Sequence, residues 1–473
     1  MSETADLVIA GGTVVNAHGR ERAHVVIRDG HIVQLIDAKR PTPAGRQIID
    51  AHDQLVIPGG VDGHCHVAQI TGPYRTLDDF AVTSEAALWG GTTTIMDFGI
   101  PRDTHESPLA AARNKLDLAR DARCDVALHG SVLTWDGTTA AQLDQLARMG
   151  ICSVKMYTTN RGTTIADGDT ILKVLHELKR LDGLAYIHAE HDAMIVDCTD
   201  QHAADGHTGI QHLHHTRPGL AEEASVREVL DMAEYTGAAV YFVHQTTPIA
   251  VDLVTQARDR GITAYSETCP HYLTLDDSVY AGDFPEWFSC CPPMRDRKTV
   301  QALRTRLAQG GIHTVSSDHS CFDRSQKREH LDDIRLMPHG LPGIETRMPV
   351  TYTAMVVEQG LPVEQFVDVF ATQPAQINRI PRKGAIAPGF DADLVILDPD
   401  TSRVVDGRAL HMGTDFSPFN GRELWGWPDI VISQGRVVVA DGRFHDPGPV
   451  GRFIARYAPG HTQVAAIPAT RTA

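Results

Sequence analysis

The chain has 473 residues, enough for one large α/β domain and a smaller accessory domain. Hydrophobic residues make up 42% of it and charged residues 22%, which is typical of a soluble globular protein and excludes a disordered or fibrous one. The 60 acidic residues outnumber the 43 basic ones, and the resulting net charge of −17 disfavours nucleic acid and anionic membranes as partners.

The sequence also predicts the cellular compartment, the state of the cysteines and metal binding. Its first residues are acidic where a secretory signal is basic, and no apolar run approaches the roughly 20 residues of a membrane span, so we expect a cytoplasmic protein. The 8 cysteines include no Cys-x-x-Cys pair and are expected to be reduced thiols. The 25 histidines are an unusually high number, which makes metal sites worth seeking.

Both ends of the chain carry the same short strand pattern. Residues 6–16 read as two β-branched strands around a glycine turn, and residues 429–439 repeat this pattern. The likeness is either chance or the mark of one small β-sandwich that is built from both termini. We favour the sandwich, formed by residues 1–57 and 376–445, with residues 446–473 as a C-terminal tail or an arm on a neighbouring subunit.

Between these ends, strand and helix patterns alternate. Strand patterns lie near residues 60–66, 92–98, 125–131, 151–157, 184–188, 239–244, 262–267 and 312–318. Helical stretches separate most of them, including 79–89, 169–181, 221–235 and 296–309. Eight βα units predict a (β/α)8 TIM-type barrel over residues 58–375, whose active site would lie at the carboxyl ends of the strands. The rival fold, a doubly wound open sheet, lacks its usual Gly-x-Gly-x-x-Gly after the first strand.

Metal-type side chains stand at the ends of several of these strands. His64 and His66 are two residues apart in an extended strand, so both project from the same face. The other strand ends carry Lys155, His188, His244 and Asp318. Each of these alone is more often a packed or turn residue than a ligand, but the carboxyl ends of barrel strands share one rim. Imidazole and carboxylate ligands favour zinc, with manganese, iron or cobalt as alternatives.

Lys155 is unusual in such a set, because its ammonium group would repel metal cations and is costly to bury without an anion. It fits if carbon dioxide has converted its amine to a carbamate, whose two oxygens could bridge two metals. We therefore expect two divalent metal ions, with Zn2+ favoured by ligand type, and a CO2-derived carbamate on Lys155.

A set of short motifs carries a family resemblance. They are residues 58–66 (Pro-Gly-Gly-Val-Asp-Gly-His-Cys-His), 150–155 (Gly-Ile-Cys-Ser-Val-Lys), 188–190 (His-Ala-Glu), 267–273 (Glu-Thr-Cys-Pro-His-Tyr-Leu), 292–295 (Pro-Pro-Met-Arg) and 317–319 (Ser-Asp-His). In these motifs the chain resembles the amidohydrolase superfamily, and within it the hydantoinase and dihydropyrimidinase branch of the cyclic amidohydrolases. The likeness runs from about residue 6 to about residue 456.

The resemblance implies a binuclear metal-dependent hydrolase that opens the amide bond of a cyclic ureide or imide. The first metal would be held by His64, His66 and Asp318, the second by His188 and His244, and carbamylated Lys155 would bridge the two. A hydroxide between the metals would be the nucleophile, and Asp318 would pass its proton to the leaving nitrogen. The resemblance also implies a homodimer or homotetramer that acts on a small molecule.

The sequence departs from this branch at three positions beside the expected pocket. Asn160 stands where the family has a tyrosine that steadies the developing oxyanion, Cys291 where it has serine, and His339 where it has asparagine. We expect Asn160 to bind substrate and to act in catalysis as a shorter donor, unless it is only a turn residue and Tyr157 reaches in instead. Cys291 and His339 are expected to bind substrate through main-chain groups.

These departures leave two alternatives open. One is an allantoinase-like or otherwise specialised cyclic amide hydrolase. The other is a metal-free scaffold like the dihydropyrimidinase-like proteins that have lost their ligands, which the filled ligand positions disfavour. Dihydroorotate is a poor candidate substrate, because residues 67–70 lack the arginine that dihydroorotases place after their His-x-His.

Overall fold

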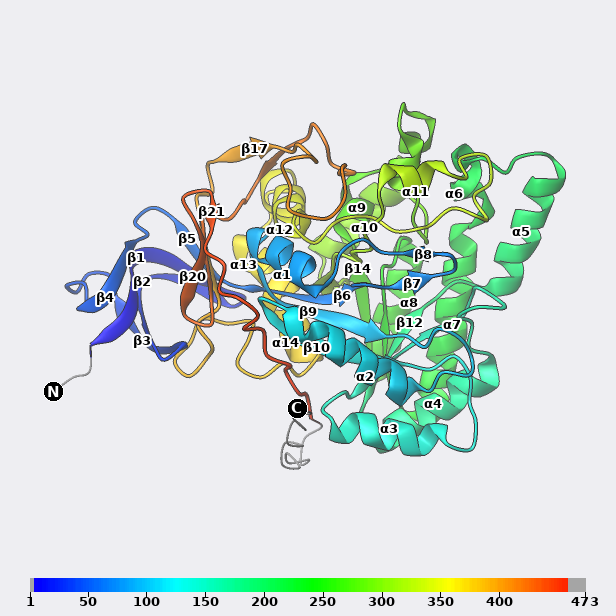
Figure 1. Cartoon of the computed structure of the whole chain (residues 1–473), viewed down its shortest axis with the longest axis horizontal. Coiled ribbons are helices and arrows are strands. Elements are labelled where there is room, and N and C mark those ends of the chain that lie inside the picture. Colours follow the sequence, from blue (N-terminus) through cyan, green and yellow to red (C-terminus); the bar gives the residue numbers. More distant parts are fainter. Residues whose placement is uncertain (1–3, 458–473) are drawn as a thin grey trace, which may run out of the picture.

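The computed structural model describes residues 4–457, and a barrel of eight parallel strands forms its larger part (Figure 1). In order around the barrel the strands are β6 (Gly60–Cys65), β9 (Thr92–Gly99), β10 (Asp125–Ser131), β11 (Ser153–Tyr157), β12 (Leu184–His188), β13 (Ala239–Phe242), β14 (Ala264–Thr268) and β15 (Thr314–Val315). Each strand follows its neighbour in sequence, so every connection is a crossover that carries a helix back along the outside.

The barrel closes between its first strand and the residues after its last one. A parallel bridge joins Cys65 to His319. The amide of Asp318 donates to the carbonyl of His64 over 2.9 Å, and the amide of His66 donates to the carbonyl of His319 over 2.7 Å. These bonds place the His-x-His motif and the Asp-His pair next to each other. The predicted (β/α)8 fold is confirmed.

Helices cover the outside of the barrel. The longer ones are α1 (Phe80–Trp89), α2 (Pro108–Leu118), α3 (Thr139–Arg148), α4 (Gly168–Arg180), α5 (Asp192–Ala204), α7 (Gly219–Thr236), α8 (Pro248–Asp259) and α10 (Arg297–Ala308). Helix α4 illustrates why these segments are helical. Asp167 caps its first turn by accepting a hydrogen bond from the amide of Thr170, and Ile171, Val174 and Leu178 form its buried face.

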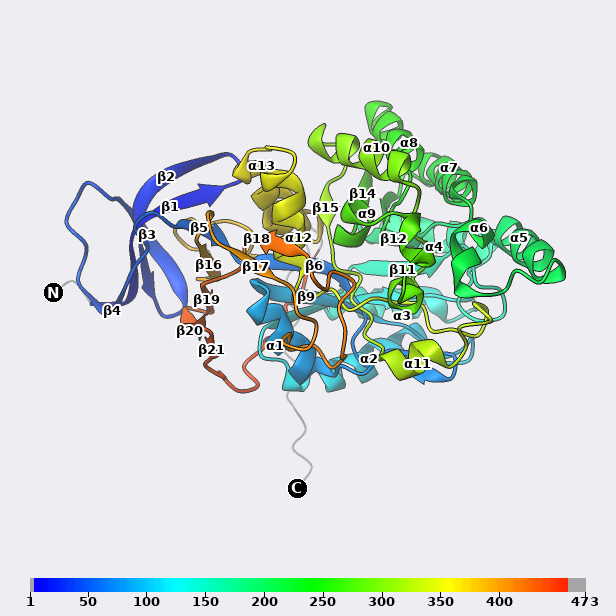
Figure 2. The same cartoon turned by 90° about the horizontal axis from the view of Figure 1, so that it is seen from above.

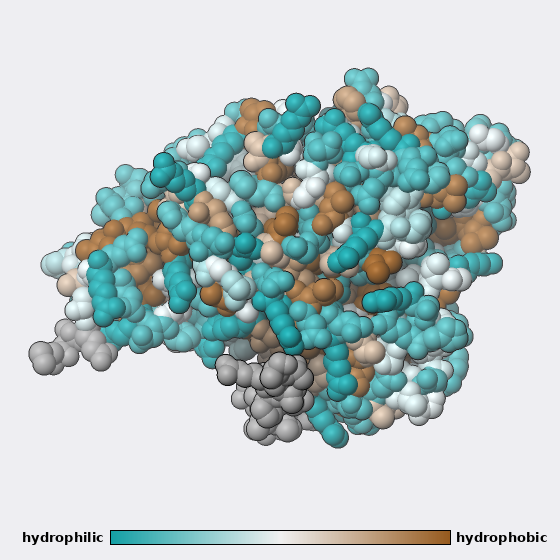
Figure 3. All heavy atoms as spheres, in the orientation of Figure 1, coloured by the Kyte–Doolittle hydropathy of each residue, from teal (hydrophilic) through white to brown (hydrophobic). Residues whose placement is uncertain are grey.

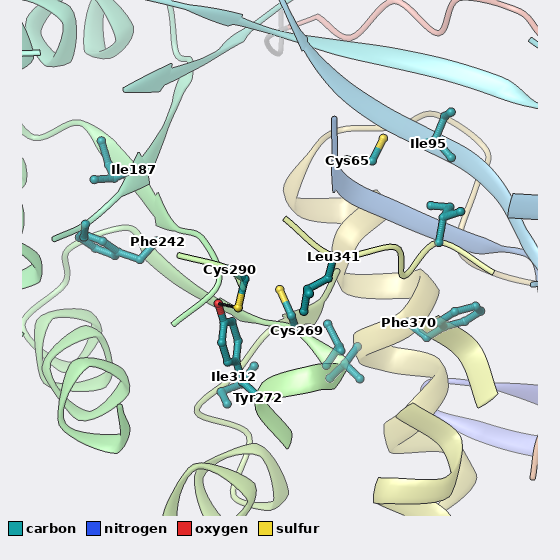
Figure 4. Close-up of a cluster of buried hydrophobic side chains, with 14 of the residues drawn as sticks. Cys65, Ile95, Ile187, Phe242, Cys269, Tyr272, Cys290, Ile312, Leu341 and Phe370 are labelled. Carbon is teal, nitrogen blue, oxygen red and sulfur yellow. Dashed lines mark hydrogen bonds between the residues drawn. The ribbon is translucent and has the colours of Figure 1, made fainter. Parts of the chain in front are cut away.

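Buried apolar side chains fill the layer between the strands and the helices. Figure 4 shows Ile95 of β9, Ile187 of β12 and Phe242 of β13 in this layer. Their side chains, like that of Phe370 near the end of the barrel sequence, have no exposed surface. Because both faces of a parallel barrel strand are covered, these strands are buried along their whole length and carry the apolar residues that made them visible in the sequence.

The second part of the molecule is a nine-stranded sheet formed by both ends of the chain, as expected (Figure 2). The N-terminal strands are β1 (Ala5–Asn16), β2 (Gly19–Arg28), β3 (His31–Asp37), β4 (Gly45–Asp50) and β5 (Leu55–Pro58), and the C-terminal strands are β16 (Leu394–Leu397), β19 (Ile430–Ser433), β20 (Arg436–Ala440) and β21 (Arg443–Phe444). The two groups meet where β5 pairs antiparallel with β16. Residues 6–16 are not two strands around a turn, because Gly11, at a φ of +73°, introduces only a bulge into the continuous strand β1.

A buried ionic cluster joins the two parts. The ammonium of Lys383 lies 2.6 Å from a carboxylate oxygen of Asp125 in β10 and 3.2 Å from one of Asp391, and it also pairs with Asp393 beside β16. Arg452 bonds to the carboxylates of Asp125 and Asp391 as well, over 2.6 and 2.8 Å. The terminal sheet is thus tied electrostatically to the barrel wall.

The described C-terminal residues lie against the barrel of their own chain. The amide of Ile454 donates to the carbonyl of Val126 over 2.7 Å, and the buried guanidinium of Arg456 donates to the hydroxyl of Ser153 over 2.9 Å. The rest of the expected tail, residues 458–473, lies outside the described part of the chain.

The surface is mostly hydrophilic on the face that Figure 3 shows, with hydrophobic residues in groups over the terminal sheet at the left and across the middle of the molecule. Val33 of β3 and Ile48 of β4 are among the exposed hydrophobic residues of the chain. Within residues 4–457, no helix combines the length and the apolar character needed to cross a bilayer.

Candidate metal centre and active site

Three of the candidate ligands meet at the closing edge of the barrel. Both Nε2 atoms of His64 and His66 face Asp318, at 3.1 and 3.3 Å from its Oδ1 atom. The two Nε2 atoms are 3.3 Å apart. The alternation of side chains along the end of β6 and into the next residue, His66, directs both imidazoles to one point and turns Cys65 between them into the wall, as expected.

The other three candidate ligands lie beside this group. The ring of His244 has its centroid 5.5 Å from that of His64 and 4.5 Å from that of His188. Lys155 is buried, and its Nζ atom lies 5.1 Å from the ring centroids of Phe98 and of Tyr157. The structure therefore brings all six candidate ligands together on one rim.

The backbone is unusual at two of these positions. His244 has a φ of 40° and Asp318 a φ of 48°, although residues other than glycine rarely adopt positive φ. His244 lies two residues after the end of β13 and Asp318 three residues after the end of β15, where the barrel strands have ended. Backbone conformations of this kind are concentrated at functional sites.

Two buried glutamates, Glu267 and Glu190, orient His64 and His188. The Nδ1 atom of His64 lies 2.7 Å from an oxygen of Glu267, whose carboxylate also accepts the amide of His244 over 3.1 Å. The Nε2 atom of His188 lies 2.8 Å from an oxygen of Glu190. Arg217 pairs in turn with the carboxylate of Glu190. A carboxylate on the outer nitrogen of an imidazole fixes the tautomer and leaves the other nitrogen free to bind a cation.

Electrostatics favour an anionic Asp318. Burial alone would raise the pKa of this carboxyl, but the charge and hydrogen bonds of His64 and His66 hold it well below its usual range. Burial likewise works to lower the pKa of His64, yet the carboxylates of Asp318 and Glu267 raise it to about 9. Burial lowers the pKa of Lys155 to about 8, with partial compensation by Asp318.

The two candidate oxyanion donors lie in different environments. Asn160 is exposed, has a φ of 71°, and donates from its side-chain amide to the hydroxyl of Thr164 over 3.2 Å within its own loop. Tyr157 is buried, with its ring centroid 5.5 Å from that of His188. The pKa of the Tyr157 phenol is raised by burial and then by the carboxylates of Asp318 and Asp97.

Cys291 and His339 lie on neighbouring segments. The amide of Gly340 donates to the carbonyl of Ser289 over 2.9 Å, which joins the two segments, and the Nε2 atom of His339 lies 3.0 Å from the carbonyl oxygen of Ile334. Burial and then the charge of Arg217 lower the pKa of His339 to about 3. The ring is thus neutral and sits on the side of the site where Arg217 holds Glu190.

Comparison with known proteins places this geometry in a family. The model of the amidohydrolase family matches residues 55–438. The chain belongs to this family. It is 34% identical to the D-hydantoinase of Ralstonia pickettii over 95% of its own length and 99% of that protein, and 32% identical to Dihydropyrimidinase 2 of Caenorhabditis briggsae over 95% and 88%. The crystal structure of dihydropyrimidinase from Brevibacillus agri NCHU1002 superposes with a TM-score of 0.91 at 32% identity, covering 95% of this chain and 98% of that one.

The donor set of this amidohydrolase fits metal ions. His64, His66 and Asp318 bring two imidazole nitrogens and a carboxylate oxygen close enough together to share one ion. The Nδ1 atom of His244 is buried and has no hydrogen-bond partner within the described residues. Imidazole nitrogens and a carboxylate oxygen suit zinc and related divalent ions, which would displace the proton of His64 on binding.

Sequence reasoning missed the roles of Glu267, Glu190 and Arg217 in this amidohydrolase. Glu267 and Glu190 belong to the family motifs, but their hydrogen bonds to His64 and His188 come from the fold. One signal was present, because a glutamate inside a buried barrel strand such as β14 needs a buried partner.

Proposed function

We propose that this amidohydrolase opens the amide bond of a cyclic ureide or imide of the hydantoin or dihydropyrimidine type. The observation that carries the proposal is the meeting of His64, His66 and Asp318 around one point, with the other candidate ligands beside them. The similarity to proteins named D-hydantoinase and dihydropyrimidinase along almost the whole chain supports the choice of substrate class.

The chain would hold two divalent metal ions, with zinc favoured by the ligand types. His64, His66 and Asp318 would hold the first, His188 and His244 the second, and Lys155 would bridge them. When bound, the ions would polarise the scissile carbonyl and activate the attacking water.

Lys155 would act in this site as a carbamate. The neutral amine attacks carbon dioxide, a nitrogen–carbon bond forms, and one proton is released to leave an anionic carbamate. A pKa of about 8 leaves part of the amine neutral near pH 7, so the reaction does not first require a strongly basic amine to lose its proton. The carbamate also removes the problem of a buried cation beside two metal ions.

Asp318 would move the proton. Its carboxylate takes a proton from the attacking water and delivers it to the ring nitrogen as the carbon–nitrogen bond breaks. The carbonyl carbon thus gains a hydroxyl, the nitrogen gains a hydrogen, and the product contains one more water than the ring. The lowered pKa of Asp318 keeps it in the form that can accept the proton.

Tyr157 is the better placed of the two candidate donors to the developing oxyanion. Its phenol is buried beside Lys155 and His188, whereas Asn160 is exposed and bonds to its own loop. A buried donor aimed at developing charge contributes far more than a solvated one. On this basis Tyr157 donates to the developing oxyanion. In the family this role belongs to a tyrosine at the position that Asn160 occupies here.

A narrower or different ring preference is the second candidate function. Asn160 replaces the family tyrosine, and the neutral imidazole of His339 lies beside the Arg217–Glu190 pair. Both differences change the lining of the pocket that a substituent on the substrate would contact. An allantoinase-like specificity falls within this alternative. The chemistry at Asp318 and Lys155 would be the same.

We also propose that the enzyme works in the cytoplasm as a homodimer or homotetramer. Sedimentation velocity of the purified chain distinguishes these assemblies from a monomer, and a single monomeric species at working concentration would contradict the proposal.

Ring opening by the zinc- and bicarbonate-treated protein tests the function directly. The substrates are hydantoin, 5-substituted hydantoins, dihydrouracil, cyclic imides and allantoin, with Asp318→Asn as the control. We expect turnover of at least one ring, and a loss of roughly a thousandfold or more in the Asp318→Asn protein if it still holds metal. Equal turnover by both proteins would contradict the role of Asp318.

A further inference from the structure

A second group of metal-ligating side chains lies outside the active centre. Five histidines occur in one short stretch: His202, His207, His212, His214 and His215. This stretch runs from the end of α5 through a 3-10 turn (Ile210–His212) into α6 (Leu213–Thr216). Figures 1 and 2 place α5 and α6 at the end of the molecule opposite the terminal sheet.

Four of the rings form a cluster. The centroids of His207 and His212 are 4.5 Å apart. His202 lies 6.3 Å from His207 and 6.5 Å from His212, and His215 lies 6.0 Å from His202 and 6.4 Å from His212. Imidazoles that share one zinc ion at about 2.1 Å have centroids roughly 5 Å apart. Four of these pairs would need to close by about 1 to 1.5 Å through side-chain torsions, and His207 and His215, which make no ring contact with each other, would need to approach further.

Solvent exposure and hydrogen bonding leave nitrogen atoms of these four histidines accessible to a metal ion. His207 and His215 are exposed, and His202 and His212 are half-buried, so an ion can reach them from solvent and the rings can turn. The Nδ1 atom of His202 donates to the carbonyl of Cys198 over 2.9 Å. This bond fixes the tautomer in which Nε2 carries a free lone pair, as is usual for a histidine that binds metal.

We propose that this cluster binds one divalent transition-metal ion of the kind that imidazole prefers, such as zinc, nickel or copper. The ligands are His202, His207, His212 and His215. The Cys198 thiol is not among them, because its Sγ atom donates to the carbonyl of His215 over 3.0 Å and so holds α6 against α5. This site is separate from the proposed catalytic pair of ions and goes beyond the proposed function.

The ion would tie together two elements beside the active site. It would join the end of α5 to α6, which ends at Thr216, and the next residue, Arg217, pairs with Glu190. Glu190 in turn orients His188. Metal binding in the cluster would therefore stabilise the segment 205–216 that leads to this pair.

Zinc binding by the full-length holoenzyme tests the proposal, with Zn2+ alone as the probe. Equilibrium dialysis against buffered free zinc should reveal one site per chain beyond the active centre. In the variant His207→Gln/His212→Gln the affinity of this site should fall by at least about tenfold, because half of the ligands are lost. In His18→Gln/His176→Gln, which removes two exposed histidines elsewhere, it should be unchanged.

Two further measurements separate this site from the catalytic one. Hydrogen exchange of residues 205–216 should slow on zinc addition in the wild type and in Lys155→Ala, but not in His207→Gln/His212→Gln. Equal zinc binding by the cluster variant and the wild type would overturn the proposal. So would loss of the additional zinc in the control variant, which would mean adventitious surface binding only.

Discussion

The Nδ1 atom of His64 lies 2.7 Å from a carboxylate oxygen of Glu267, and both side chains are fully buried. The two residues belong to β6 and β14, and the same carboxylate accepts hydrogen bonds from the hydroxyl of Tyr241 and the amide of His244. Glu267 thus links ligands on two sides of the proposed metal pair.

Replacement of Glu267 by glutamine should weaken metal binding. The amide cannot carry the negative charge that stabilises the His64 ring, so we expect metal affinity to fall by about 10- to 100-fold. Metal content after dialysis against graded chelator measures the effect. Glu345→Gln alters a second glutamate–histidine pair, between buried Glu345 and half-buried His411 away from the site, and should leave metal affinity unchanged. Equal metal content in both variants would contradict the role of Glu267.

The oxyanion donor can be identified by two substitutions. We expect Tyr157→Phe to lower kcat by about a hundredfold, because it removes a buried donor while keeping the ring. Asn160→Ala, at an exposed position, should change kcat by less than about threefold. Steady-state kinetics on the best substrate ring provides the measurement. The opposite order of effects would assign the donor to Asn160.

Loss of Lys155 should remove the proposed bridge. In Lys155→Ala the catalytic metals should be lost and turnover with them, because the carbamate can no longer form. Addition of a short-chain carboxylic acid should restore part of both, since its two oxygens can occupy the vacated space. Metal content and turnover are measured on the same samples, and full activity without the acid would rule out the bridge.

The ionic cluster between the two parts of the fold predicts a large effect on stability. Lys383→Met would leave Asp125, Asp391 and Asp393 buried without their shared cation. We expect a loss of about 3–5 kcal/mol in the free energy of unfolding, with Arg452 compensating in part. Urea denaturation measures it, and Lys173→Met, which breaks an exposed pair with Asp169, is the control with an expected loss below about 1 kcal/mol. Equal losses in both would contradict the account.

Hydrophobic patterning predicted most of the barrel, but it could not predict where the backbone departs from regular structure. Residues 125–131 and 184–188 have the same bounds as β10 and β12, because both faces of these strands are buried. The last strand was predicted over residues 312–318 and is only β15, since Asp318, at positive φ, instead bonds to the His64 carbonyl.

The sequence also could not predict which residues far apart in the chain form hydrogen bonds with each other. His64 and Glu267 are 203 residues apart and meet only because the barrel closes. The six candidate ligands were predictable from their places at strand ends. The positive φ of Asn160 agrees with the turn-residue alternative, because asparagine is enriched in that conformation, but its bond to Thr164 was not predictable. The many histidines were countable, but only the structure shows that four of them gather beside α6.

The mass of the product formed from a cyclic ureide tests the central claim most directly. Protein with a measured content of two catalytic metal ions per chain is incubated with hydantoins, dihydrouracil, cyclic imides and allantoin, and the reaction is followed by mass spectrometry. The account predicts that at least one ring gains the mass of one water and becomes the open N-carbamoyl or amide acid, and that Asp318→Asn forms little of it. Metal-loaded wild-type protein that leaves every ring intact would contradict the account.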